Sequence, residues 1–340
     1  MPDGKPPMNN AELTSVIDQQ TNTRVTALFA EQATWVFLAA VLAAVVLGLS
    51  TDTFASSQNL FNVSRNFAFV GLVALGMTVV IISGGIDLSV GSVVCLAAMV
   101  QAIVMNAGYG FWTAAALSLG ASALVGFVNG ALIAWLRMPP FVVTLGMLSI
   151  ARSLAMVLSG NRMIYEFGPD QAFLFALGGG STFGIAHPVI ALALFGCVTA
   201  FLLRWSQWGT HIFAIGANER AAVLTGIAVP RVKISVYVFS SLMAGITGIL
   251  EAGWLGGVTT NLGQSMELAV IAATVIGGAN LLGGSGTVAG AVVGAALIEI
   301  IRNSLILLGI STFWQGAFVG FFIILAVAFD RIRALRTNQL

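Results

Sequence analysis

Two glycine-rich segments carry the polar groups that interrupt otherwise apolar stretches of this chain. The first is Gly84-Gly85-Ile86-Asp87-Leu88-Ser89-Val90-Gly91-Ser92, and the second, 193 residues later, is Gly277-Gly278-Ala279-Asn280-Leu281-Leu282-Gly283-Gly284-Ser285. Each segment ends one apolar run and begins another, which predicts a break between two helices. Interrupted helices that recur in corresponding halves of a chain bring unpaired backbone groups to a binding cavity. Close packing of helices through small residues is the alternative explanation.

Asp87 is the ionisable side chain of the first segment, and Asn280 takes its place in the second. A carboxylate near lipid is costly unless it is solvated, paired or capping a helix, so such residues are functional candidates. Asp87 precedes an apolar run that begins near Ser89, where it can cap the first turn of a helix. We expect this capping role, at the cytoplasmic surface of the membrane, and keep a proton or substrate role as the alternative.

The sequence contains no pattern of side chains typical of catalysis or of metal binding. His187 and His211 are the only histidines, so a zinc site is not expected, and there is no Ser/His/Asp grouping. The phosphate-loop motif G-x-x-x-x-G-K-[ST] is absent, and Lys5 and Lys233 are the only lysines. We therefore expect no catalytic residue and no ATP hydrolysis by this chain alone.

The composition requires that most of the chain be solvated by lipid. Hydrophobic residues make up 58% of the 340 residues and charged residues 8%, and the mean hydropathy is +0.97. Soluble domains are about a quarter charged, and this chain has too little polar surface to cover a core of its size. The apolar runs are long and lack the period of two of a β-barrel strand. The sequence predicts an all-α integral membrane protein, and its net charge of +1 argues against nucleic-acid binding.

Ten segments approach the length of about 20 helical residues that crosses a bilayer. The predicted spans are residues 34–50, 67–83, 89–106, 111–136, 140–159, 187–203, 234–256, 267–283, 286–308 and 313–329. Eight spans are the alternative, if the pairs joined near residues 84–88 and 283–286 are each one broken helix. The transmembrane domain then covers residues 34–330, between a polar segment at 1–33 that can form an interfacial helix and a tail at 331–340.

Basic residues set the expected orientation, because they collect in cytoplasmic loops. Ten of the 14 Lys and Arg lie in segments that this topology places inside, and only Arg65 and Arg162 lie in outer loops. Both termini and the loop at 204–233 are therefore expected in the cytoplasm. The segments at 160–186 and 257–266 are expected outside.

Charged residues near the membrane are few. Glu251 and Glu267 flank the outer segment at 257–266, where we expect solvent or a docked partner to reach them. Glu299 lies three residues before Arg302, the spacing of an ion pair on a helix. Arg152 lies within one or two turns of an interface that its long side chain can reach.

The inner loop contains the most informative polar stretch, between Thr210 and Pro230. After an initial turn, Asn218 can cap a short helix, Glu219 is favourable in its first turn, and Gly226 and Pro230 can end it. Two turns of helix are marginal in isolation, so this helix needs a surface to pack against. The membrane surface and a groove in a soluble partner are the two possibilities.

Four stretches in register resemble the ribose-type monosaccharide ABC permease family of the branched-chain amino acid/ribose permease superfamily. They are residues 84–92, Pro139-Pro140-Phe141-Val142-Val143-Thr144-Leu145-Gly146-Met147, Ala214-Ile215-Gly216-Ala217-Asn218 with Ala221-Ala222 and Gly226-Ile227, and Glu267-Leu268 with Gly277-Gly278 and Gly283-Gly284-Ser285-Gly286-Thr287. The resemblance covers about residues 55–335. Ala217, where many relatives carry a second glycine, is a mild departure.

The resemblance implies a type II importer fold of about ten helices in two pseudo-repeated halves, in the bacterial inner membrane. It implies as partners a second copy or a related permease, two cytoplasmic ATPases that bind ATP and Mg²⁺, and a periplasmic or lipid-anchored sugar-binding protein. The permease itself holds no cofactor. In this family the inner-loop helix couples to the ATPase, which maps onto Asn218, Glu219, Arg220, Ala221, Ala222, Thr225, Gly226 and Ile227.

The substrate path is less defined by the sequence. Phe141, Thr144, Phe239 and Trp254 are the first candidates, because aromatic and hydroxyl groups suit a passing sugar, and packing is their competing role. A neutral sugar needs no charge in its conduit, so we expect weak contacts there and selectivity in the binding protein.

Other solutes and another energy source stay open as alternatives. A permease for branched-chain amino acids or nucleosides shares the architecture, although the form of residues 84–92 favours sugars. A proton-coupled secondary sugar transporter would use Asp87 or Glu299 as the carrier, but the inner-loop helix argues against it. A membrane-embedded enzyme has the least support.

Overall fold

The computed structural model describes residues 32–51, 53–311, 314, 316–318, 320, 321 and 324. Its helices are α2 (Gln32–Ser50), α3 (Ser57–Ile82), α4 (Val90–Asn106), α5 (Phe111–Trp135), α6 (Pro140–Ser159), α7 (Gln171–Gly179), α8 (His187–Trp205), α9 (Gln207–Ala217), α10 (Glu219–Leu224), α11 (Val229–Leu255), α12 (Met266–Ile276) and α13 (Val288–Leu307). A hairpin of β1 (Ser181–Thr182) and β2 (Ile185–Ala186) is the only departure from helix among the elements of these residues. The predicted interfacial helix before Gln32, most of the span at 313–329 and the tail at 331–340 lie outside the described residues.

Seven helices of the described part are long and apolar enough to cross a membrane, namely α2, α3, α5, α6, α8, α11 and α13. The helices α4 and α12 are apolar but shorter, at 17 and 11 residues. At about 1.5 Å per residue, α12 extends about 16 Å, roughly half of a bilayer core of about 30 Å. The prediction that residues 267–283 form a complete span is therefore wrong. The helix stops at Ile276 because the chain turns out of the helical path at Gly278, where φ is +97°.

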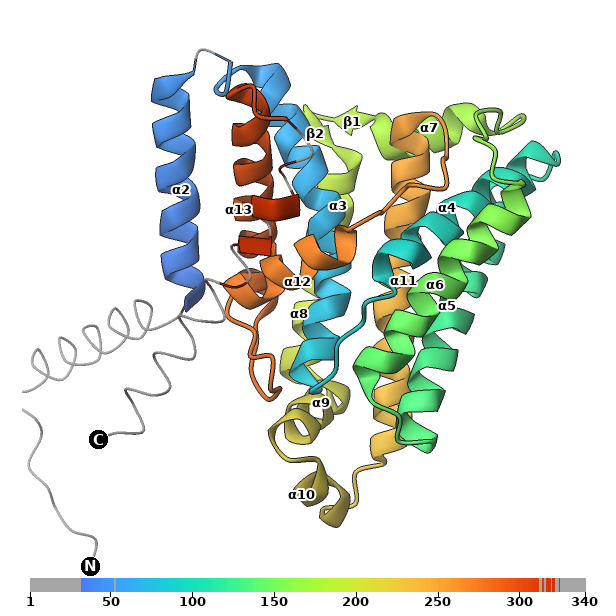
Figure 1. The fold of residues 1–340 in the computed structure, drawn as a ribbon, viewed down its shortest axis with the longest axis vertical. Helices are drawn as coiled ribbons and strands as arrows, with labels where there is room; N and C mark the ends of the chain where they lie inside the picture. Colours follow the sequence, from blue (N-terminus) through green and yellow to red (C-terminus); the bar gives the residue numbers. More distant parts are fainter. Residues whose placement is uncertain are drawn as a thin grey trace, which may run out of the picture.

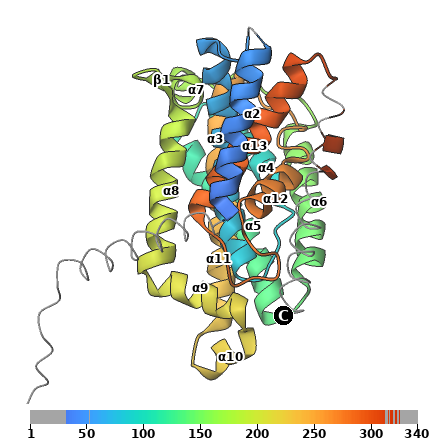
Figure 2. The same ribbon diagram turned by 90° about the vertical axis from the view of Figure 1, so that its left-hand side faces the viewer.

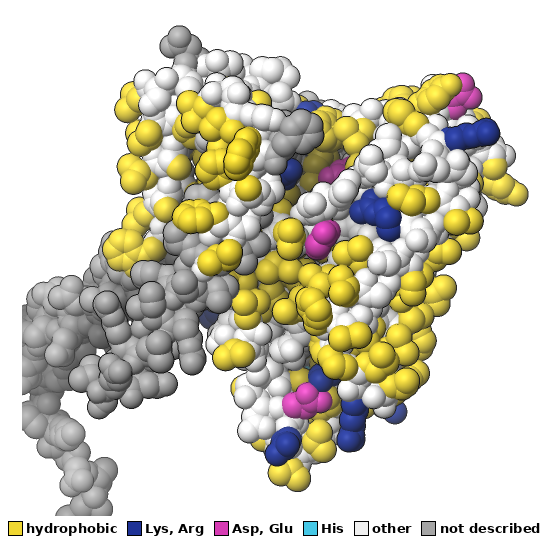
Figure 3. Space-filling view, in the orientation of Figure 1, with side chains coloured by type: hydrophobic (Ala, Val, Ile, Leu, Met, Phe, Trp, Pro, Cys, Tyr) yellow, Lys and Arg dark blue, Asp and Glu magenta, His cyan; other side chains and the backbone are white. Residues whose placement is uncertain are grey.

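The helices α3 and α4 lie at the centre of the bundle. In the most apolar 18-residue stretch of α3, 83% is buried inside the molecule, whereas the corresponding share is 11% in α2 and 28% in α6 and α8. Most side chains of α4 are buried, and α11 packs against α3, α4 and α5. Large apolar side chains such as Leu49, Val157 and Phe201 are exposed on the outer helices, and Figure 3 shows such side chains over much of the surface. A surface of this kind is suited to contact with lipid.

The helix α3 begins ten residues before its predicted start at residue 67. Polar side chains in its first turns obscured the helix in the sequence, and in the fold they have partners on other helices. Asn59 exchanges two hydrogen bonds with Asn303 of α13, at 3.1 and 2.9 Å. The guanidinium of Arg65 lies over the ring of Trp254 of α11, 4.3 Å from its centroid. Contacts between distant parts of the chain thus override the local polar signal.

The two ends of the bundle carry different elements. Figures 1 and 2 show α7 and the hairpin β1–β2 at one end, and α9 and α10 projecting from the opposite end. The predicted turn at residues 210–217 is wrong, because these residues belong to α9. Pro230 lies in the first turn of α11, where its missing N–H leaves no hydrogen bond unmade.

Candidate functional site

A cavity of about 810 Å³ lies between α3, α11, α12 and α13 and the loop at 256–265. It belongs to the half of the bundle that carries α7, and Figure 3 shows charged side chains inside the hollow of this face. Pockets for small molecules measure about 300–1,000 Å³. The polar, charged and aromatic residues of its lining are Asn66, Phe69, Glu251, Trp254, Thr259, Asn261, Gln264, Ser265, Glu299 and Arg302. The cavity therefore offers a small solute both hydrogen-bonding groups and aromatic faces.

Three charged side chains of this cavity come from the last turns of α11 and from α13. Glu299 Oε2 lies 3.8 Å from Arg302 Nη1, which confirms the ion pair predicted from their spacing. Asn66 of α3 donates a side-chain hydrogen bond to Glu299. Glu251 lies inside the cavity and is only 6% exposed, which corrects the expected position at the edge of an outer loop. Among the described residues, its Oε2 has no hydrogen-bond partner.

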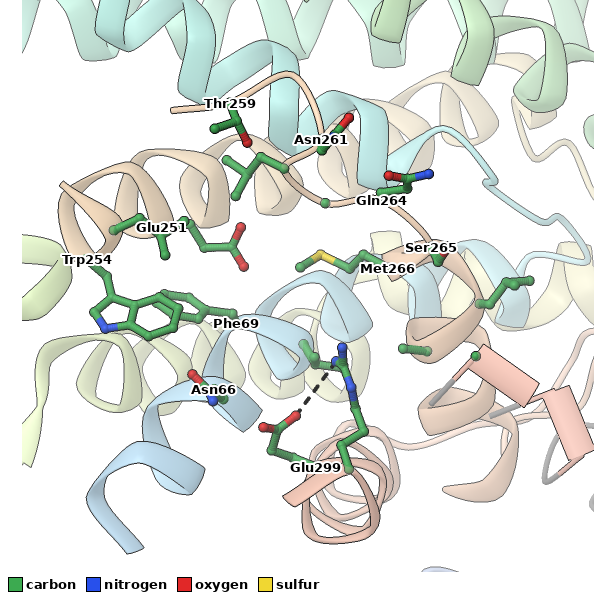
Figure 4. A pocket seen from close by; sticks show the side chains of 18 of the residues that line it. Asn66, Phe69, Glu251, Trp254, Thr259, Asn261, Gln264, Ser265, Met266 and Glu299 are labelled. Carbon is green, nitrogen blue, oxygen red and sulfur yellow. Dashed lines mark ion pairs between the residues drawn. The ribbon is translucent and has the colours of Figure 1, made fainter. Parts of the chain in front are cut away.

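One wall of the cavity is aromatic. The rings of Phe69 and Trp254 lie 5.5 Å apart between centroids, at an angle of 33°. Figure 4 shows both rings beside the carboxyl group of Glu251, which extends from α11 toward Met266. Aromatic faces pack against apolar ligand surfaces while polar groups around them fix the orientation.

Trp254 is the only one of the four predicted path residues that lines this cavity. Phe141 is 55% exposed on α6. Thr144 is fully buried and donates hydrogen bonds to the carbonyls of Ile86 and Pro140. Phe239 lines a shallow apolar pocket near α8 and packs against Trp208, with centroids 5.6 Å apart. The structure thus does not bring these four residues together.

Asp87 is completely buried between the central helices. Its Oδ1 accepts hydrogen bonds from the backbone N–H and the hydroxyl of Ser89, at 3.0 and 2.6 Å. Its Oδ2 accepts one from Ser240 of α11 at 3.0 Å, and Ser89 in turn accepts one from Asn129 of α5. The bond from the Ser89 N–H holds the turn that precedes α4, but the N-cap of α4 is Ser89 and no side chain caps that helix, so the predicted N-cap role of Asp87 is wrong. The carboxyl group is also buried in the bundle, whereas it was predicted to lie at a surface. The carboxyl group points into the bundle because Ser240 of α11 is one of its partners, and Asn129 of α5 holds its other partner, Ser89.

Replacing Asp87 tests whether this group mainly supports the fold. We expect Asp87→Ala to lower the free energy of unfolding by about 1–3 kcal/mol for each donor left without a partner. Asp87→Asn keeps one oxygen acceptor and is expected to cost less. The thermal midpoint of the purified protein in detergent measures both. An alanine variant that melts like the wild type would contradict the supporting role.

Both glycine-rich segments break helices as predicted, and they also lie against each other. The Gly284 N–H donates to the Ile82 carbonyl at the end of α3, at 2.9 Å. A Cβ atom on Gly283 would lie 3.0 Å from the Cα of Gly84. The third member of the contact is Gly216 near the end of α9, where a Cβ atom would overlap the Ile82 carbonyl. We call Gly84, Gly216, Gly283 and Gly284 the glycine junction.

The other predicted residues of the two segments also serve the backbone. At Gly278 the chain takes a φ of +97°, which favours glycine. Three other glycines pack closely: Gly85 lies beside the Tyr237 hydroxyl, Gly91 against Gly263, and Gly277 against Gly290. The side chain of Asn280 holds its own turn, because its Oδ1 accepts a hydrogen bond from the Leu282 N–H at 2.9 Å. Neither residues 84–92 nor residues 277–285 belong to the lining of the cavity.

The short helix predicted in the inner loop is present as α10. Asn218 caps it, since its Oδ1 accepts from the Ala221 N–H at 3.1 Å. Glu219 pairs with Lys233 of α11 at 2.7 Å, and the chain turns at Gly226 with a φ of +84°. Leu224 is 88% exposed. Of the other residues predicted to couple to the ATPase, three are exposed, namely Arg220, Ala221 and Thr225. Ile227 is half-buried and Ala222 is buried.

Residues 59–327 match the family described as the permease component of branched-chain amino acid transport systems, and the chain therefore belongs to this family. It is a membrane transport permease rather than an enzyme, as the motifs predicted. No solved structure gives a significant match.

Several curated relatives are similar over most of their length. A probable ABC transporter permease protein of Sinorhizobium fredii is 38% identical, over 88% of this chain and 89% of its own. The ribose import permease protein of Escherichia coli (strain K12) is 35% identical, over 85% and 90%. The L-arabinose ABC transporter permease protein of Azospirillum brasilense is 34% identical, over 84% of each. The resemblance to sugar permeases deduced from the motifs is thus confirmed over nearly the whole chain.

Proposed function

We propose that this chain is the membrane-spanning permease subunit of an ATP-binding cassette importer and carries a neutral monosaccharide across the bacterial inner membrane. Its relatives named for ribose and arabinose support the substrate class. The observation that carries the proposal is the polar, aromatic-walled cavity in one half of a bundle whose opposite end presents an exposed, capped helix. A sugar offers both hydroxyl groups and apolar ring faces to such a lining.

The proposed orientation places α10 in the cytoplasm and α7 outside. Four basic residues support it, because they lie in or near the loops around α9 and α10: Arg204, Arg220, Arg231 and Lys233. The cavity then opens toward the outer half of the membrane. A periplasmic or lipid-anchored sugar-binding protein would dock on the segments at 160–186 and 257–266, and both termini would be cytoplasmic.

The proposed mechanism uses α10 as the coupling helix. A small exposed helix with apolar tips can fit a groove of a soluble partner, here an ATPase that binds ATP and Mg²⁺. With two permeases and two ATPases, closure of the ATPases on ATP would pull on α10 and then on α9. The glycine junction connects the end of α9 to the breaks after α3 and before α13, and both helices line the cavity. Motion of α9 would therefore reach the sugar site and shift it between outward-open and inward-open states.

The decisive experiment reconstitutes the permease with its ATPase and its binding protein in proteoliposomes. We expect ATP-dependent uptake of one or a few labelled monosaccharides from a panel that also contains polyols, a branched-chain amino acid and a nucleoside. Uptake of an amino acid or a nucleoside alone would change the substrate class. Uptake without ATP, ATPase and binding protein would contradict the importer and favour a secondary carrier.

Leu224 provides a test of the coupling helix. We expect Leu224→Asp to lower ATP-driven uptake by about tenfold or more, because it buries a charge at a contact that needs an apolar side chain. Leu224→Met is the matched control, since it keeps an apolar side chain of similar size. Copurification of the ATPase with each variant reports docking directly. Normal docking and uptake by Leu224→Asp would rule out Leu224 as a contact residue.

A further inference from the structure

Glu251 differs from the other charged side chains of the cavity because one of its carboxyl oxygens has no partner. The residue is 6% exposed, and among the described residues its Oε2 makes no hydrogen bond. A buried polar atom without a partner is costly, and native structures usually satisfy such atoms with protein, water or ligand. Figure 4 shows this carboxyl group in the open space of the cavity. A ligand with hydroxyl groups would supply the missing hydrogen bond.

Trp254 supplies the second half of a sugar site on the same helix. Glu251 and Trp254 are three residues apart on α11, so their side chains lie on one face. The indole ring has two neighbours, the ring of Phe69 at 5.5 Å between centroids and the guanidinium of Arg65 at 4.3 Å from its centroid. These contacts hold the ring in one orientation, and a preorganised aromatic surface binds a ligand with little loss of conformational entropy.

The part of α11 that carries these two side chains packs closely against α7. Gly253 of α11 and Gly178 of α7 allow the two helices to touch, because a Cβ atom on Gly253 would overlap the Leu174 carbonyl and one on Gly178 the Leu250 carbonyl. Residues on a rigid helix can present a ligand with fixed distances between groups. The geometry is therefore suited to recognition and not only to passage.

We infer that Glu251 and Trp254 form a selective subsite for a neutral monosaccharide inside the permease. The Glu251 carboxyl group accepts a hydrogen bond from one ring hydroxyl, while the apolar face of the sugar ring packs on the part of Trp254 that lines the cavity. Asn66, Gln264 and the Glu299–Arg302 pair surround this position with further donors and acceptors. This inference rests on the proposed function and deepens it. It assigns part of the sugar selectivity to the permease, in contrast to the expectation that the binding protein alone selects.

The test uses the reconstituted complex and the sugar that the wild type transports. We expect Glu251→Gln and Trp254→Leu each to lower the maximal rate of ATP-driven uptake by about tenfold, the effect of one well-placed contact. The KM is expected to stay the same, because the binding protein captures the sugar from solution. Trp112→Leu on α5 is the control, because this tryptophan is 76% exposed on the outside of the bundle.

Monodeoxy analogues of the sugar separate direct contact from support of the fold. We expect the wild type to transport one analogue poorly, because the hydroxyl group that this analogue lacks is the partner of Glu251. The uptake rate of this analogue is expected to be the same in Glu251→Gln as in the wild type. If Glu251→Gln lowers uptake of the parent sugar and of every analogue by the same factor, or does not lower uptake at all, the subsite is wrong. Either result would leave the proposed importer function intact. Lack of ATP-driven sugar uptake by the wild type would overturn the proposed function together with the subsite.

Discussion

Replacing Gly216 with valine is expected to reduce ATP-driven sugar uptake by about tenfold or more, within the range typical of coupling free energies of about 1–3 kcal/mol. Position 216 has no room for a side chain, because a Cβ atom there would overlap the Ile82 carbonyl and would lie 2.5 Å from the Gly284 backbone nitrogen. The larger side chain must push α9 away from the breaks after α3 and before α13. The hydrogen bond from Gly284 to Ile82 lies at the point of contact and is expected to weaken.

The pattern of the loss distinguishes broken coupling from a broken fold. Overpacking costs at least about 1–3 kcal/mol of stability, and more where, as here, backbone atoms must move. The thermal midpoint of the purified variant in detergent reports whether it is folded. We expect the ATPases of the Gly216→Val complex to hydrolyse ATP while sugar uptake fails. A variant that keeps the wild-type ratio of sugar imported to ATP hydrolysed would show that the glycine junction does not transmit the motion.

Gly196→Ala is the control for the loss of a helical glycine. Gly196 also lies within a helix, α8, but a Cβ atom added there would have no neighbouring atom within 4 Å. Alanine forms helix better than glycine by about 1 kcal/mol, so this variant is expected to transport normally and to melt at the same temperature or higher. The contrast between the two sites isolates the crowding at Gly216 from the general effect of removing a glycine.

The sequence predicted features that depend on local chemistry. Residues 84–92 and 277–285 break helices because their glycines allow conformations and close contacts that other residues do not, and Asn218 caps α10 because of its own side chain. The ion pair between Glu299 and Arg302 likewise follows from spacing on one helix. Each of these features involves residues close together in the chain, and therefore each left a signal in the sequence.

Features that depend on distant contacts were not predictable in the same way. The sequence does not show that Gly216 meets Gly84 and Gly283, because packing of three separate segments brings them together. The first turns of α3 looked like a loop, although Asn59 has its partner on α13. Among the residues that line the cavity, Trp254 was predicted from the sequence to contact the sugar, whereas Asn66 was not. A polar residue such as Asn66 at the start of an apolar run is a weak signal that merits more weight in a membrane protein.

Replacing Arg152 with methionine is expected to release the loop that covers the cavity. Arg152 of α6 donates from Nη1 to the carbonyls of Thr260 and Leu262, at 2.8 and 2.6 Å. The loop is also attached to the segment after α6, because Ile164 pairs with Val258 and Thr260 donates to Asn161. Hydrogen bonds to charged groups contribute about 1.5–3 kcal/mol each, so Arg152 contributes the strongest of these attachments.

The released loop would alter the cavity itself, since Thr259, Asn261 and Gln264 belong to its lining. We expect Arg152→Met to lower sugar uptake by about tenfold or more and to accelerate amide hydrogen exchange in residues 257–265, while exchange in α4 stays slow. Arg152→Lys is the matched variant, and an intermediate effect is expected because an ammonium group cannot reproduce the geometry of the guanidinium. If exchange in the loop is unchanged in Arg152→Met, then its other attachments suffice, and the shape of the cavity does not depend on α6.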